Sequence, residues 1–258
     1  MSIWVDGKFL GADAAPKPAA GVVAPFETIG AHGGDLPLWP RHLARLQSAV
    51  QRLKLSWQPT PELRAAASRL ALEHQAGEAI LRLLLVPDRG TVHTVLTARS
   101  GVRVGKVRLV PTVVERKPGG PPAALKAMPR TFYDAVLQQA QDGGADDGVV
   151  VTEDGEVLET AVGNLWLRLD GTWVTPPLDG RVLPGIARAI LLERARATGL
   201  PVAERSCSLD DVHRAEAIAH SNAVYGPRPA ELLGSGPAAV EIVDRELGKL
   251  WDWGRLGS

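Results

Sequence analysis

Three features from residue 126 onward could do chemistry together: a lysine, a carboxylate and a helix that begins after a glycine. Lys126 has apolar neighbours throughout residues 123–128, and Glu159 ends a predicted strand. Apolar surroundings disfavour the charged form of an amine, which suits a lysine that must form a Schiff base. Pro184 and Gly185 precede a helical pattern, and the N–H groups of a first helical turn attract anions.

These are the groups that pyridoxal 5′-phosphate (PLP) requires of a protein. A lysine holds its aldehyde, a carboxylate keeps its pyridine nitrogen protonated, and a helix N-terminus receives its phosphate. Arg45 lies beside Leu46 on a predicted helix and could fork its guanidinium onto that phosphate. Each group also has a simpler interpretation, because solvated cations, strand-end carboxylates and plain helix starts are common in globular proteins.

Composition excludes several other classes. The 29 Lys+Arg and 29 Asp+Glu residues give a net charge of 0, which argues against nucleic acid or an anionic membrane as a partner. The single cysteine, Cys207, excludes an intrachain disulfide and is expected to be a small apolar residue rather than a nucleophile. The 6 histidines lack metal-ligand spacing, so no metal site is expected. We find neither a signal peptide nor an apolar run that could span a bilayer, and we expect a cytoplasmic protein.

The order of the predicted elements indicates the fold class. Helices and strands mix without regular β-α-β alternation, which favours α/β or α+β with mixed sheets over a Rossmann fold. The expected helices span residues 40–53, 60–74, 132–141, 185–198 and 240–251, among hairpins and strands at 3–10, 21–29, 79–97, 108–114, 147–159, 164–175, 201–206 and 216–220. Residues 118–122 are rich in glycine and proline, so no helix or central strand can cross them. The sequence therefore predicts an N-terminal domain (1–117), a linker (118–122) and a C-terminal domain (123–258).

Several motifs, in this order, resemble the class IV aminotransferases, which are the fold-type IV PLP enzymes. They extend over nearly the whole chain and comprise Phe26-Glu27-Thr28, His42-Leu43-Ala44-Arg45-Leu46, Arg82 on a strand, Lys126, Glu159 to Asn164, and Pro184 to Arg188. The resemblance implies a two-domain α/β fold like that of D-amino acid aminotransferases, PLP between the domains, and a homodimer.

The resemblance also implies a set of site residues. Lys126 would be the catalytic Schiff-base lysine, and Glu159 would pair the ring nitrogen of PLP. The remaining cofactor-binding residues would be Arg45, Asn164, Ile186, Ala187, Asn222 and Ala223. Phe26 and Arg82 would bind the substrate, with Arg82 on a substrate carboxylate.

One segment resembles a subgroup of the family. Ser221 to Pro229 is similar to the Thr-Asn-Ser-Leu-x-Gly-x-x-Pro segment of the 4-amino-4-deoxychorismate lyases. That resemblance implies a carbon–oxygen lyase that eliminates pyruvate from a small-molecule substrate and forms 4-aminobenzoate for folate biosynthesis, with Lys126 as general base. A branched-chain or D-amino acid aminotransferase is the alternative, because it uses the same cofactor, lysine and carboxylate. Ala187 and Ala223 replace hydroxyl residues of the family motifs, so a catalytically idle binding protein is the third hypothesis.

Overall fold

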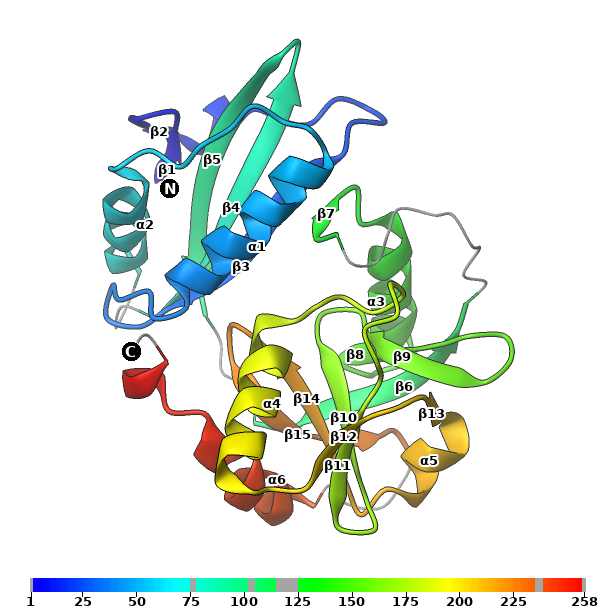
Figure 1. Ribbon diagram of the computed structural model, residues 1–258. Helices are drawn as coiled ribbons and strands as arrows, with labels where there is room; N and C mark the ends of the chain where they lie inside the picture. The colour runs from blue at the N-terminus through cyan, green and yellow to red at the C-terminus, as the bar shows by residue number, and fades with distance from the viewer. Residues whose placement is uncertain (1, 75–77, 102–104, 115–124, 235–238, 257–258) are drawn as a thin grey trace. The chain divides into compact units, whose positions relative to one another are not determined.

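The computed structural model describes residues 2–74, 78–101, 105–114, 125–234 and 239–256 of the chain. These residues form two compact units (Figure 1), each of which is described by itself. The first unit takes the described residues of Met1–Val102, Leu125–Pro129 and Trp253–Ser258; the second takes those of Arg103–Ala124 and Arg130–Asp252. The predicted linker, residues 118–122, lies outside the described residues. The grouping differs from the predicted ranges 1–117 and 123–258, because residues 107–113 belong to the second unit and Lys126 to the first.

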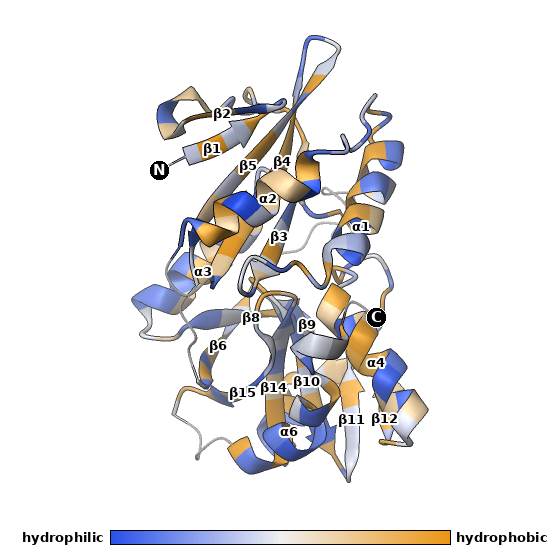
Figure 2. Ribbon diagram, turned by 90° about the vertical axis from the view of Figure 1, so that its left-hand side faces the viewer, coloured by the Kyte–Doolittle hydropathy of each residue, from blue (hydrophilic) through white to orange (hydrophobic). Residues whose placement is uncertain are grey.

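The first unit is an antiparallel sheet covered by two helices. Its described strands run in the order β2 (Lys8–Gly11), β1 (Ser2–Val5), β5 (Thr91–Ser100), β4 (Ala79–Asp88), β3 (Ala24–Ala31) and β7 (Ala127–Met128). Helix α1 (Trp39–Arg52) packs against β3, and α2 (Leu63–Leu72) packs against β4 and β5. In Figure 2, α1 carries both apolar and polar residues, as expected of a helix that packs one face on a sheet and exposes the other.

Strand alternation decides which side chains of this sheet meet the helices. Ile29 of β3 and Leu81 and Leu83 of β4 are fully buried in the core that includes Leu46 of α1. A slip of one residue would turn these side chains to the other face, so their burial fixes the register of the β3–β4 pair.

The second unit is a mixed sheet surrounded by helices. Its described strands run in the order β12 (Val202–Glu204), β11 (Thr172–Thr175), β10 (Asn164–Leu169), β14 (Ala217–Asn222), β15 (Gly226–Leu232), β6 (Val107–Val113), β8 (Asp147–Val151), β9 (Glu156–Thr160) and β13 (Cys207–Ser208). The β12–β11, β15–β6 and β6–β8 pairs are parallel, and the other pairs are antiparallel. Helices α3 (Thr131–Asp142), α4 (Ile186–Thr198), α5 (Leu209–Arg214) and α6 (Val240–Glu246) pack on this sheet (Figure 1).

Most predicted elements are present, and the exceptions are short or rich in proline. Strands β7 and β15 were not predicted, and α6 ends at Glu246, followed by the 3₁₀ turn Gly248–Leu250, instead of continuing to residue 251. None of the helices in the described ranges is long and apolar enough to cross a membrane.

Candidate functional site

Lys126 lies beside two other predicted site residues in the first unit. It directly precedes β7, which pairs with the edge of β3, and the backbone N–H of Phe26 donates to the Lys126 carbonyl over 3.0 Å. The Lys126 Nζ atom is 4.8 Å from the centroid of the Phe26 ring. The guanidinium carbon of Arg82 is 4.6 Å from the same centroid. A cation at this distance is attracted to the ring face, so Phe26 gathers both cationic side chains around one aromatic group.

Strand pairing explains why Arg82 reaches this ring. Arg82 of β4 lies directly opposite Thr28 of β3, so both side chains point to the same face of the sheet. Phe26 is two residues before Thr28 and shares that face. The predicted substrate residues Phe26 and Arg82 therefore lie together, and they face away from the side of the sheet on which Leu81 and Leu83 are buried.

Arg45 is held by a buried carboxylate that the sequence analysis did not single out. Its Nε and Nη2 donate to the two oxygens of Glu27 over 2.7 and 2.6 Å. His42 lies one helical turn earlier and contacts Glu27 Oε2 through Nδ1 at 2.7 Å. The ion pair uses two of the five N–H donors of the guanidinium and sets a negative charge beside it. Arg45 as a phosphate ligand remains a prediction, and the structure assigns it this second role on α1.

The electrostatics of this cluster keep Glu27 ionised. Burial alone would raise the pKa of Glu27, but the charge of Arg45 and the hydrogen bonds from Arg45 and His42 outweigh burial and lower it to about 2. Burial lowers the pKa of His42 against the opposing effect of Glu27. Strand alternation could have identified Glu27, because it shares a face with the buried Ile29 and so needed a partner.

Glu159 is the centre of the candidate site in the second unit. Its side chain is 2% exposed at the end of β9. The Tyr133 hydroxyl donates to Oε1 over 2.6 Å, and the backbone N–H of Leu183 donates to Oε2 over 3.0 Å. Tyr133 lies on α3 and was not predicted, because nothing in the sequence connects the first turn of that helix with a strand end. These two bonds fix the orientation of a buried carboxylate, which a ring nitrogen requires of its partner.

Asn164 and Gly185 shape the segment that leads into α4. Asn164 Nδ2 donates to the Leu183 carbonyl over 3.1 Å. A Cβ added to Gly185 would lie 3.1 Å from Asn164 Cγ and would overlap Oδ1. The backbone of Gly185 has φ −69° and ψ 136°, which any residue adopts, so the need for glycine here is one of space.

The first turn of α4 presents backbone N–H groups without a side-chain cap at Gly185. Ile186 and Ala187 are buried at this turn, and the first N–H groups of a helix have no partner within the helix. Arg188 is 2% exposed, and its Nη2 donates to the Pro176 carbonyl over 2.8 Å and to Glu204 Oε2 over 2.7 Å. The bonds of Arg188 hold the first turn of α4 in place, and the N–H groups of that turn are suited to bind an anion.

Asn222 and Ala223 lie in the turn between β14 and β15. The Asn222 Oδ1 accepts the N–H groups of Val224 and Tyr225 over 3.1 and 3.0 Å. Gly226 ends the turn at φ +74°, in the left-handed region that favours glycine. Asn222 therefore has a local role as the residue that closes this turn, and a phosphate contact at Asn222 or Ala223 remains a prediction.

Two further expectations from the sequence concern the Cys207 thiol and metal ions. Cys207 is buried, and burial raises the pKa of its thiol to about 11, so the thiol stays protonated near neutral pH. Among the described residues, no group of three His, Cys, Asp or Glu side chains could hold a metal ion.

Known proteins resemble this chain in both sequence and fold. The model of the family "Amino-transferase class IV" matches residues 24–233. A "Probable branched-chain-amino-acid aminotransferase" of Thermotoga maritima is 26% identical over 253 residues, which cover 90% of this chain and 87% of the relative. Among solved structures, "A hypothetical aminotransferase from Mycobacterium tuberculosis, PLP-bound form" has a TM-score of 0.81 at 21% identity and covers 99% of this chain and 100% of its own. A "Putative 4-amino-4-deoxychorismate lyase" of Legionella pneumophila has a TM-score of 0.80 at 21% identity and covers 92% and 96%. The predicted fold, with two mixed α/β units of this type, is confirmed.

Proposed function

Because the chain belongs to the class IV aminotransferase family, we propose that it is a PLP-dependent aminotransferase acting on a branched-chain or D-amino acid. The observation that carries the PLP-dependent part of the proposal is the buried carboxylate of Glu159, held by Tyr133 and the N–H of Leu183. The Thermotoga maritima relative supports the branched-chain substrate class, because its similarity covers both units of the chain. It also moves the proposal away from the lyase that the Ser221 to Pro229 segment implied.

The residues of this chain fit PLP chemically. Glu159 supplies a buried carboxyl group, the α4 start supplies backbone donors, and Lys126 supplies an amine next to an aromatic ring. A Cβ on Gly185 would overlap Asn164, so the residue directly before the helix must be glycine. When bound, PLP withdraws electrons from the carbon that bears the amino group and carries that group between two substrates.

Each residue would then have a definite task. Lys126 would hold the PLP aldehyde between turnovers, and its Nζ would afterwards move a proton at the substrate Cα. Glu159 would accept a hydrogen bond from the ring nitrogen, and the N–H groups of Ile186 and Ala187 would bind the phosphate. Arg82 would bind the substrate carboxylate in a forked geometry.

The second candidate function is the 4-amino-4-deoxychorismate lyase. It is favoured by Ser221 to Pro229 and by the fold shared with the Legionella pneumophila protein of that name. Lys126 and Glu159 would have the same tasks in this lyase, but it forms 4-aminobenzoate and pyruvate and needs no amino-group acceptor.

We also propose that the protein is a homodimer, which sedimentation of the purified protein tests.

A paired product assay tests the proposal. The purified protein is loaded with PLP and given leucine, valine or D-alanine with 2-oxoglutarate, and glutamate is measured. A parallel sample receives 4-amino-4-deoxychorismate, and 4-aminobenzoate and pyruvate are measured. Lys126→Ala is compared with Lys106→Ala, because Lys106 is an exposed lysine that forms an ion pair with Glu231 at 2.7 Å.

The outcomes separate the three hypotheses. Glutamate formation that is lost in Lys126→Ala and retained in Lys106→Ala supports the aminotransferase. Release of 4-aminobenzoate and pyruvate in equal amounts, without glutamate, would replace it with the lyase. A native protein that takes up no PLP would leave the catalytically idle family member.

A further inference from the structure

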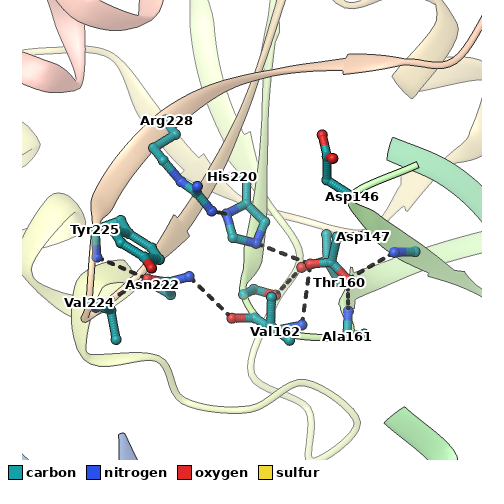
Figure 3. A network of polar contacts seen from close by, with 12 residues as sticks. Asp146, Asp147, Thr160, Ala161, Val162, His220, Asn222, Val224, Tyr225 and Arg228 are labelled. Carbon is teal, nitrogen blue, oxygen red and sulfur yellow. Dashed lines mark hydrogen bonds and ion pairs between the residues drawn. The ribbon is translucent and has the colours of Figure 1, made fainter. Parts of the chain in front are cut away.

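A buried polar network lies under the turn that connects β9 with β10 (Figure 3). Asp147, at the start of β8, is 1% exposed, and His220, on β14, is fully buried. His220 Nε2 and Asp147 Oδ2 are 3.2 Å apart. Neither residue was singled out by the sequence analysis, and neither has a task in the proposed function.

Asp147 binds the turn through its backbone. Its Oδ1 accepts the N–H groups of Gly148 over 2.8 Å and Ala161 over 3.1 Å, and its Oδ2 accepts the N–H of Val162 over 3.3 Å. A carboxyl group has two oxygens and can accept several such bonds at once. One buried carboxylate therefore holds two successive residues of the turn.

The turn is the junction of three predicted cofactor-binding residues. Glu159 lies directly before Thr160, which donates its N–H to the Gly163 carbonyl over 2.9 Å, and Asn164 follows Gly163. The Nδ2 of Asn222 donates to the Val162 carbonyl over 3.5 Å. A displacement of the turn would therefore move all three residues at once.

Arg228 determines which nitrogen of His220 carries the proton. Arg228 lies directly opposite His220 in the β14–β15 pair, and its Nη2 is 3.4 Å from His220 Nδ1. A guanidinium has donors only, so this contact favours Nδ1 as the acceptor and the tautomer that carries its proton on Nε2, the nitrogen 3.2 Å from Asp147 Oδ2. Asp147 therefore lies between the His220 ring on one side and the backbone N–H groups of Ala161 and Val162, which donate to it, on the other.

Space as well as polarity requires this arrangement. A Cβ added to Gly163 would lie 2.7 Å from His220 Cε1 and 2.7 Å from the Ser221 carbonyl. The imidazole therefore packs directly against the backbone of the turn, and only glycine fits between them.

We propose that Asp147 and His220 are positioning residues that hold the Thr160–Gly163 turn in the geometry needed for PLP, with Nε2 of His220 as the protonated nitrogen. The inference rests on the proposed function. It places the support of Glu159, Asn164 and Asn222 in one buried pair of side chains.

The test compares two adjacent carboxylates. Asp147→Asn presents an amide group to the N–H groups of Ala161 and Val162, which weakens its bonds with them. Asp146→Asn is the matched control, because Asp146 is the preceding residue and pairs with the half-exposed Arg108 at 2.8 Å. We expect Asp147→Asn to weaken PLP binding roughly ten- to hundredfold in titrations of the visible absorption of bound PLP, and Asp146→Asn to leave it unchanged.

A second pair of variants covers the case in which Asp147→Asn does not fold. His220→Gln keeps a side-chain N–H donor towards Asp147, and His220→Met removes it. PLP affinity should be retained better by His220→Gln than by His220→Met, and both should be compared at equal fractions of folded protein, measured by unfolding in urea. Nitrogen NMR of labelled histidine in the native protein should show His220 protonated on Nε2, and amide exchange of Ala161 and Val162 should be faster in His220→Met without PLP.

The outcomes distinguish the failure of this inference from that of the proposed function. Native protein that binds PLP, with Asp147→Asn or His220→Met binding it equally well, would overturn the positioning role and leave the aminotransferase intact. A proton on Nδ1 would overturn the assigned polarity and with it the inference. Native protein that binds no PLP would overturn the proposed function and this inference together.

Discussion

Replacing Gly185 with alanine tests how the start of α4 is shaped. At φ −69° and ψ 136° the backbone accepts any residue, so backbone strain does not contribute. The added Cβ would lie 3.1 Å from Asn164 Cγ and overlap its Oδ1. Either the Asn164 side chain rotates or the segment before the helix moves, and both changes break the 3.1 Å bond from Asn164 Nδ2 to the Leu183 carbonyl.

The magnitude follows from these two losses. Forcing a methyl group into filled space costs about 1–3 kcal/mol. Losing one hydrogen bond between neutral groups adds about 1 kcal/mol. The free energy of unfolding without PLP should therefore fall by about 2–4 kcal/mol, as measured by urea titration. PLP affinity should also fall at least about tenfold, because the displaced backbone carries the N–H groups of Ile186 and Ala187.

Gly11→Ala is a close control. Gly11 has φ −70° and ψ 153°, nearly the backbone conformation of Gly185, and an added Cβ meets no atom within 4 Å. This substitution adds the same methyl group in open space, so unfolding should change by less than about 0.5 kcal/mol.

A double-mutant cycle identifies the source of the cost. In an Asn164→Ala background the overlapping oxygen is absent, so Gly185→Ala should cost about 1–2 kcal/mol less than it does in the native protein. If Gly185→Ala costs the same in both backgrounds, Asn164 is not what excludes a side chain. If Gly185→Ala behaves like Gly11→Ala in both assays, the steric reasoning is refuted.

Four further substitutions test other parts of the site. The depressed pKa of Glu27, about 2 against 4.5, contributes stability above pH 4.5 that is lost as the pH falls towards 2. The native protein should lose on the order of 3 kcal/mol over that range in denaturant titrations, and this part of the loss should be absent in Glu27→Gln. Tyr133→Phe removes the 2.6 Å bond to the Glu159 carboxylate and should lower PLP affinity roughly tenfold, whereas unchanged affinity would show that this hydroxyl does not orient Glu159. Arg82→Met should raise KM for the amino acid about tenfold or more with little change in PLP affinity, and a change in PLP affinity alone would contradict a substrate role. Gly163→Ala should weaken PLP binding because its methyl group displaces the His220 ring; binding equal to that of the native protein would contradict this contact.

Local sequence pattern is enough to single out several of the candidate site residues. The apolar neighbours of Lys126, the strand that ends at Glu159 and the glycine before α4 are all short-range signals. The structure places Lys126 and Arg82 each against the ring of Phe26, and it buries Glu159, which accepts hydrogen bonds from Tyr133 and Leu183. Periodicity also predicts most of the helices and strands, because alternation and helical spacing are properties of single elements.

Residues that act through long-range pairs could not be identified in this way. Tyr133 meets Glu159 only because α3 packs on the sheet that contains β9, and Asp147 meets His220 across two strands that are distant in sequence. The pairing of Arg45 with Glu27 is of the same kind, because it depends on how α1 lies on β3; the predicted role of Arg45 as a phosphate ligand stays a prediction.

Strand β15 was missed for a physical reason. Pro227 and Pro229 lie within it, and proline cannot donate to a ladder, so the segment resembles a turn. The pairing with β6 begins only at Ala230, and residues Gly226 to Pro229 pair with β14 alone. The prolines therefore occupy the part of the strand that has a partner on one side, where a missing N–H is tolerated.

The same turn explains why the segment from Ser221 to Pro229 is a weak guide to the substrate. Its most recognisable residue, Asn222, accepts the N–H groups of Val224 and Tyr225 and so closes the turn between β14 and β15. An asparagine in this position is explained by turn geometry whichever substrate the enzyme uses. The residues predicted to meet the substrate, Phe26 and Arg82, lie in the other unit. The choice between aminotransferase and lyase should therefore depend on side chains around Phe26 and Arg82, and exchanging the Asn222 turn between the two kinds of enzyme should alter PLP affinity rather than the reaction.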